Sequence, residues 1–120
     1  MSVAVQFSDQ LESALEALAQ DEWAVADLRE RVVEGVDSAT AFASVIDVLN
    51  LARAQTDPYC FASCCWLTTD LARLSNTTEQ PPGLVEAVLE AFSASRPFGA
   101  ENEVRKVADW YRIQLPVRLS

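Results

Sequence analysis

Carboxylates are the most numerous side chains in this sequence that could support chemistry, and two groups of them share one spacing. Residues 1–36 contain eight acidic and two basic residues, a balance of −6. Two acidic trios at positions i, i+3 and i+7 would each project from one face of a helix. They are Asp9, Glu12 and Glu16, and Asp27, Glu30 and Glu34. Like charges at this spacing destabilise a helix by a few tenths of a kcal/mol, so helix formation does not require them.

Three interpretations of the acidic trios are open. They could form a solvated outer face, or a docking surface for a basic protein that acts through steering and specificity. A di-metal carboxylate site of the ferritin type needs Glu-x-x-His, and the chain contains no histidine. That absence also excludes Ser-His-Asp and Cys-His catalysis. We therefore predict no catalytic, cofactor-binding or metal-binding residues, and we predict the two trios as partner-binding residues.

The three cysteines, Cys60, Cys64 and Cys65, fall within an uncharged run that extends from residue 58 to residue 69. Cys60 and Cys64 are one helical turn apart and could supply half of a soft-metal site. No lysine or histidine adjoins them, and cysteine often packs in cores as a small hydrophobe. We predict inert core thiols without a disulfide, with redox or metal chemistry as the alternative. An odd, clustered count favours a reducing cytoplasm.

An aromatic pair near the C-terminus, Trp110-Tyr111, lies among three basic residues. Neighbouring residues on a helix point about 100° apart, so at least one of the two is expected at the surface. An exposed aromatic beside arginine is a frequent interface anchor, and both residues join the predicted partner-binding set. The alternative is that Trp110 packs beneath the tail at 115–117.

Six helices must position these residues, because apolar side chains recur with helical period and no alternating strand pattern occurs. The predicted helices span approximately residues 8–20, 21–35, 38–53, 58–74, 81–92 and 100–114. Ser8, Asp21 and Asp57 are the expected N-caps. Gly35 suits the left-handed position after a helix end.

The predicted core lies where the third and fourth helices meet. Four aliphatic side chains are expected to be fully buried there: Ile46, Leu49, Leu67 and Leu71. Trp66 is expected in the same core, and Trp23 is expected to face inward from the second helix.

The six helices group into three antiparallel hairpins, at 8–35, 37–75 and 81–114, within one predicted domain covering residues 1–120. The middle hairpin is the most apolar and the outer two are amphipathic, as the terminal units of an array should be. In this pattern the chain resembles paired-helix proteins of the HEAT and armadillo type. The resemblance implies an all-α fold stacked as a short, right-handed helical-repeat-like array. An irregular bundle explains the same periodicity.

Size and charge limit the classes of function. The chain has 120 residues, is half hydrophobic and carries a formal net charge of −9. An acidic surface repels polyanions, so neither nucleic acid nor an anionic membrane is an expected partner. The N-terminal segment lacks basic residues and no stretch reaches 18 apolar residues, so we expect neither a secretory signal nor a transmembrane helix. Arginine outnumbers lysine eight to one, as is typical of GC-rich bacterial genomes.

In size, acidity and helical pattern the chain is similar to the small bacterial immunity proteins that neutralise toxins. The resemblance implies a cytoplasmic, cofactor-free, non-enzymatic protein that binds a basic toxin or effector domain directly. A regulatory adaptor or a secretion-chaperone-like accessory protein is the alternative. A thiol- or carboxylate-dependent enzyme is a third possibility, and the acids nearest to an apolar run are then Asp47 and Asp70.

Overall fold

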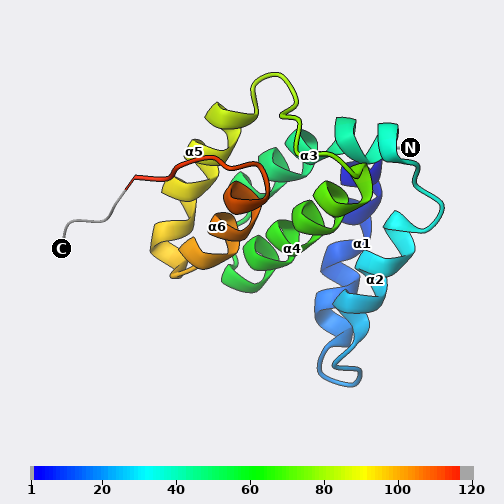
Figure 1. The fold of residues 1–120 in the computed structure, drawn as a ribbon. Coiled ribbons are helices and arrows are strands. Elements are labelled where there is room, and N and C mark those ends of the chain that lie inside the picture. The colour runs from blue at the N-terminus through cyan, green and yellow to red at the C-terminus, as the bar shows by residue number, and fades with distance from the viewer. Residues whose placement is uncertain (1, 117–120) are drawn as a thin grey trace.

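The computed structural model describes residues 2–116, which contain six α-helices, one short 3-10 helix and no strand (Figure 1). The elements are α1 (Val3–Ala17), α2 (Ala24–Val33), α3 (Ser38–Arg53), α4 (Pro58–Ser75), α5 (Leu84–Ser95), η1 (Arg96–Phe98) and α6 (Glu101–Trp110). The all-α prediction is therefore confirmed. None of the described helices is both long enough and apolar enough to cross a lipid bilayer.

The two central helices begin at side-chain caps. Asp37 accepts a hydrogen bond from the backbone N–H of Thr40 at 2.7 Å, ahead of α3. Asp57 accepts one from the backbone N–H of Cys60 at 2.9 Å, and Pro58 occupies the first position of α4. Each cap satisfies a backbone donor that the first turn leaves free. The uncharged run at residues 58–69 lies entirely within α4.

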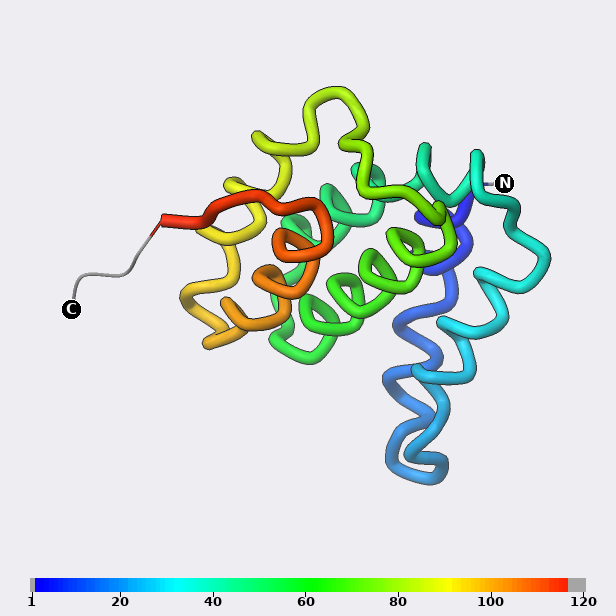
Figure 2. The backbone as a smooth tube through the Cα atoms, in the orientation of Figure 1, coloured from blue at the N-terminus to red at the C-terminus, as the bar shows by residue number. Residues whose placement is uncertain are grey.

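The six helices form three hairpins in two layers (Figures 1 and 2). α3 packs most extensively against α4, α1 pairs with α2, and α5 pairs with α6. Between hairpins, α1 and α5 contact α3, whereas α2 and α6 contact α4. One layer is therefore α1, α3 and α5, and the other is α2, α4 and α6, which is the connectivity of stacked helical hairpins. The molecule measures 40 × 36 × 18 Å, and its thickness is about two helix diameters of ~10 Å.

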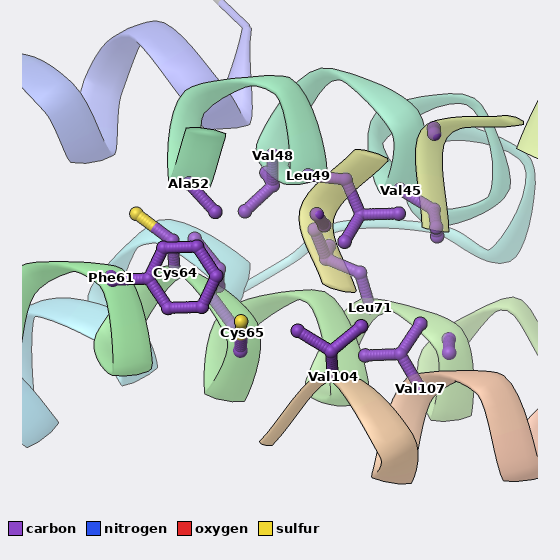
Figure 3. Packing of buried hydrophobic residues seen from close by; sticks show 14 of the residues in the cluster. Val45, Val48, Leu49, Ala52, Phe61, Cys64, Cys65, Leu71, Val104 and Val107 are labelled. Atoms are coloured by element: carbon purple, nitrogen blue, oxygen red, sulfur yellow. The ribbon is translucent and has the colours of Figure 1, made fainter. Parts of the chain in front are cut away.

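The core is centred on the interface between α3 and α4 (Figure 3). Leu49, Leu67 and Leu71 are fully buried, as predicted. Ile46 is only partly buried, so that prediction is wrong. On α3 the buried stripe runs through Val45 and Leu49, and Ile46 lies about 100° from Val45 around the helix axis, at the edge of the interface. Figure 3 also shows α6 covering α4 with two valines, Val104 and Val107.

The first hairpin differs from its prediction at both helix starts. α1 begins at Val3 and not at Ser8, because Ser2 caps it by accepting a hydrogen bond from the backbone N–H of Val5 at 3.1 Å. α2 begins at Ala24, after a turn. Trp23 lies in that turn, outside the helical register from which its inward direction was predicted, and its side chain is 63% exposed.

The last hairpin also has different boundaries. α5 begins at Leu84, after Gly83 at a φ of +83°, and not at the preceding prolines. α6 ends at Trp110, and Arg112 adopts a φ of +58°, which a continuing helix cannot contain. The segment at 111–116 then runs back over the hairpin and buries the side chains of Ile113 and Leu115. Trp66, predicted in the core, is only partly buried.

Candidate protein interface

The α1–α2 hairpin leans away from the other helices, and its connecting turn lies at the far tip (Figures 1 and 2). Trp23 belongs to this turn and is the most exposed large hydrophobic side chain in residues 2–116. A tryptophan of this exposure leaves a large apolar area in water, which costs free energy that a partner could recover. The tip of the hairpin is therefore the strongest candidate for a contact surface.

The backbone around Trp23 is fixed by hydrogen bonds. Its N–H donates to the Asp21 carboxylate at 3.0 Å, and its carbonyl accepts from the N–H of Asp27 at 2.8 Å. The N–H of Ala24 also donates to the Asp21 carbonyl at 3.2 Å. Because the turn is already ordered, a partner that covers Trp23 would pay little entropy to immobilise the backbone.

A shallow groove of about 410 Å³ runs along the hairpin from this turn, and we call it the hairpin groove. Its lining residues are Asp9, Gln10, Ser13, Ala14, Ala17, Asp21, Ala24, Asp27 and Arg31. Three carboxylates face a single arginine there, so the groove is acidic. The structure thus brings together one member of each predicted trio, Asp9 and Asp27, and adds Asp21, which sequence reasoning assigned only as a cap.

The other acids of the trios are exposed but do not line the hairpin groove. Glu12 lines a hollow beside the α3–α4 connection, Glu30 faces α4, and Glu34 lies near the start of α3. Glu16 is exposed near the end of α1. Side chains three residues apart on a helix point in directions that differ by about 60°. One member of a trio can therefore point toward one neighbouring helix while another member points to the opposite side. The six acids therefore surround the hairpin and do not form one compact patch.

The predicted aromatic pair has a different environment. The Tyr111 side chain is 2% exposed, so it is not presented to solvent. Burial raises the pKa of its hydroxyl, and the nearby Ser75 hydroxyl partly opposes that shift. Trp110 is partly buried, and its indole N–H donates to the Thr77 carbonyl at 3.1 Å. The Trp110 side chain and the Tyr111 backbone carbonyl, which accepts from the Gln80 amide at 3.0 Å, hold the C-terminal segment against the loop that precedes α5.

The cysteines lie in the core and are free thiols. Burial raises the pKa of Cys60 to about 11, with a further contribution from the Asp57 carboxylate. Burial also raises the pKa of Cys65 to about 12 and that of Cys64 still higher. Thiols in this state are poor nucleophiles and poor metal ligands. In residues 2–116 no three Cys, Asp or Glu side chains lie close enough together to hold a metal ion.

Trp23 is the candidate contact residue that sequence reasoning missed. The signal for it was the position of Trp23 directly after Asp21-Glu22, because an aspartate that caps a turn leaves the next residues outside the helix. Comparison with known protein families, with curated proteins and with solved structures finds no match, so the interpretation of this hairpin rests on its own geometry.

Proposed function

We propose that this chain is a non-enzymatic protein-binding domain that docks a basic partner through the α1–α2 hairpin. The observation that carries the proposal is the position of Trp23, exposed on an ordered turn at the end of an acidic groove. Protein interfaces commonly combine one aromatic anchor with a charged surround. The partner fitting this surface is a protein with an apolar pocket bordered by lysine and arginine.

The more specific form of the proposal is an immunity protein that neutralises a bacterial toxin. Many toxin domains that act on nucleic acids must carry basic active-site surfaces, since their substrates are polyanions. An acidic hairpin with a protruding tryptophan could cover such a surface and exclude the substrate. Charge complementarity would also accelerate association, which matters for an inhibitor that must act before the toxin does.

The experiment begins with recovery of the partner by affinity capture, followed by binding kinetics with the two purified proteins. We expect Trp23→Ala to weaken binding by at least about 30-fold, the effect of losing an interface anchor of about 2 kcal/mol. Reversing the groove acids Asp9, Asp21 and Asp27 to lysine should mainly slow association. The wild-type association rate should fall as salt concentration rises.

A matched variant separates the hairpin groove from general acidity. Reversal of Glu12, Glu16 and Glu34 changes the net charge by the same amount but leaves the hairpin groove intact. The proposal requires this variant to bind markedly faster than the groove variant. If both triple variants behave alike, only net charge matters, and if Trp23→Ala binds like wild type, the hairpin tip is not the interface.

A further inference from the structure

A second hollow lies between α2 and α4, and none of its lining residues belongs to the hairpin groove. We call it the α2–α4 groove. It has a volume of about 450 Å³ and is lined by Ala26, Arg29, Glu30, Val33, Asp70, Arg73 and Leu74. Four of these seven side chains are charged, two of each sign, and the remaining three are apolar. The groove therefore has no net charge, although the chain carries −9.

Arg29 is held in place before any ligand arrives. Its guanidinium carbon lies 5.1 Å from the centre of the Trp66 ring. Trp66 is fixed in turn, because its indole N–H donates to the Glu103 carboxylate of α6 and its ring meets Tyr59 edge-on, with centroids 5.9 Å apart. The Arg29 Nε is buried and has no hydrogen-bond partner in the described part of the chain. A planar cation held on an aromatic face is well suited to carboxylate recognition.

The charges of the α2–α4 groove are not paired with one another. Across residues 2–116, no ion pair within 4.0 Å involves Arg29, Glu30, Asp70 or Arg73. Asp70 is partly buried, and burial raises its pKa, although the charges of the two arginines oppose the shift. Arg29 and Asp70 are both partly buried, whereas Glu30 and Arg73 are exposed to water. A partly buried charge without an ion-pair partner is unfavourable, so Arg29 and Asp70 are the two side chains that would gain most from a group of opposite sign.

We infer that the α2–α4 groove binds a small zwitterion, an α-amino acid with an apolar side chain. Its carboxylate would pair with Arg29 and Arg73, and its ammonium group with Asp70 and Glu30. An isolated anion would meet two carboxylates and the repulsion of the whole chain, and an isolated cation would meet two arginines. Because α2 and α4 each contribute one arginine and one carboxylate to this groove, a ligand that carries both charges offers a partner to residues of both helices.

The apolar lining and the size of the groove narrow the ligand class. Ala26, Val33 and Leu74 offer contacts to a hydrocarbon side chain, and Leu74 is 39% exposed. Small-molecule sites usually occupy about 300–1,000 Å³, so this groove lies near the lower end of the range. A free amino acid of leucine size fits it better than an extended peptide.

The test is a titration of the full chain with leucine, followed by NMR of the Trp66 indole N–H, which is assigned with Trp66→Phe. Three analogues test the two charges: 4-methylpentanoate lacks the amine, 3-methylbutylamine lacks the carboxylate, and N-acetyl-leucine amide lacks both charges. We expect saturable shifts with leucine at millimolar concentrations and at least about tenfold weaker binding of every analogue. Analogues that bind as tightly as leucine, or the absence of a leucine shift, would overturn the inference.

Variants provide the second arm. Arg29→Gln and Asp70→Asn should each weaken leucine binding by at least about tenfold. Arg31→Gln and Asp47→Asn are matched controls, since both residues are exposed and lie outside the α2–α4 groove. Circular dichroism checks that each variant folds, and the analogue series on wild-type protein decides the question if one does not. Trp23→Ala should bind leucine like wild type, which keeps this site separate from the proposed partner interface.

Discussion

Truncation of one buried leucine tests the two-layer packing directly. Leu67 and Leu74 lie on the same helix, two turns apart, and have the same chemical structure. Leu67 is fully buried, whereas Leu74 is 39% exposed. Replacing each by alanine removes the same atoms, so the difference between the two variants reports burial alone. We expect Leu67→Ala to be much the more destabilising.

The magnitude follows from the atoms removed. Leu→Ala deletes three carbon groups, and at about 0.8 kcal/mol for each buried group the transfer contribution is about 2.4 kcal/mol. A closed site such as that of Leu67 adds the cost of the cavity, for a total of about 2–5 kcal/mol. Leu74 is already partly hydrated and leaves no closed cavity, so its truncation should cost below about 1.5 kcal/mol.

The assay is urea denaturation followed by circular dichroism, with thermal melts as a second measurement. For a chain of this size the melting temperature should fall by about 4 °C per kcal/mol, so Leu67→Ala should melt at least about 8 °C below wild type. The slope of the unfolding free energy against urea should be the same in all three proteins. Equal destabilisation by Leu67→Ala and Leu74→Ala would refute the packing of α4 between α3 and α6.

Other consequences of the structure can be measured on the same protein. Because burial raises the pKa of Cys60 and Cys65 to about 11 and 12, from an ordinary 9.0, unfolding releases thiol protons in alkali. The free energy of unfolding should therefore decline as pH rises above 9, and less steeply in a variant with Ala at Cys60, Cys64 and Cys65. Burial likewise raises the pKa of Asp70 from its ordinary 3.8, so Asp70→Asn should unfold at an equal or higher urea concentration at pH 7, with the difference vanishing below pH 3.8. Gly83→Ala should lower the free energy of unfolding by about 1–2 kcal/mol, because Gly83 has a φ of +83°, which strains a residue that carries a Cβ. No atom lies within 4 Å of the added Cβ, so a steric clash does not contribute.

The parts of the fold that the sequence predicts well are those governed by periodicity and strong caps. α3 and α4 begin at the predicted positions 38 and 58, because the aspartate before each helix caps its first turn by accepting a backbone hydrogen bond. The predicted start of α1 is wrong because Ser2 and Ser8 are equally good caps by residue type. Only the packing of Val3 and Phe7 in the core selects Ser2. The predicted end of α6 is wrong because the apolar residues at 113 and 115 fit a helical pattern, although they belong to a non-helical segment that buries them against the hairpin.

The candidate interface was predictable in composition but not in geometry. Acid content identified the first hairpin, yet one-dimensional spacing cannot tell which side of α1 faces α2. Asp9 and Asp27 share the hairpin groove because the two helices pack together, whereas Glu12 faces the α3–α4 connection. The sequence analysis predicted an inward Trp23 from its apolar side chain alone. In the structure the turn that contains Trp23 sets the direction of its side chain. The α2–α4 groove depends on contacts between distant segments, which periodicity does not specify.

The unequal packing of the three hairpins has a consequence for local opening. α3 and α4 are covered by a hairpin on each side, whereas α1 and α2 are covered on one side only, and α2 touches α4 along a short stretch. Segments with few buried contacts open at a lower free energy than the whole domain unfolds. Amide hydrogens of α1 and α2 should therefore exchange with solvent as one cooperative group, before those of α3 and α4. A partner that binds the tip of this hairpin would slow that exchange. Binding would then protect amide hydrogens throughout α1 and α2, including those far from the contact.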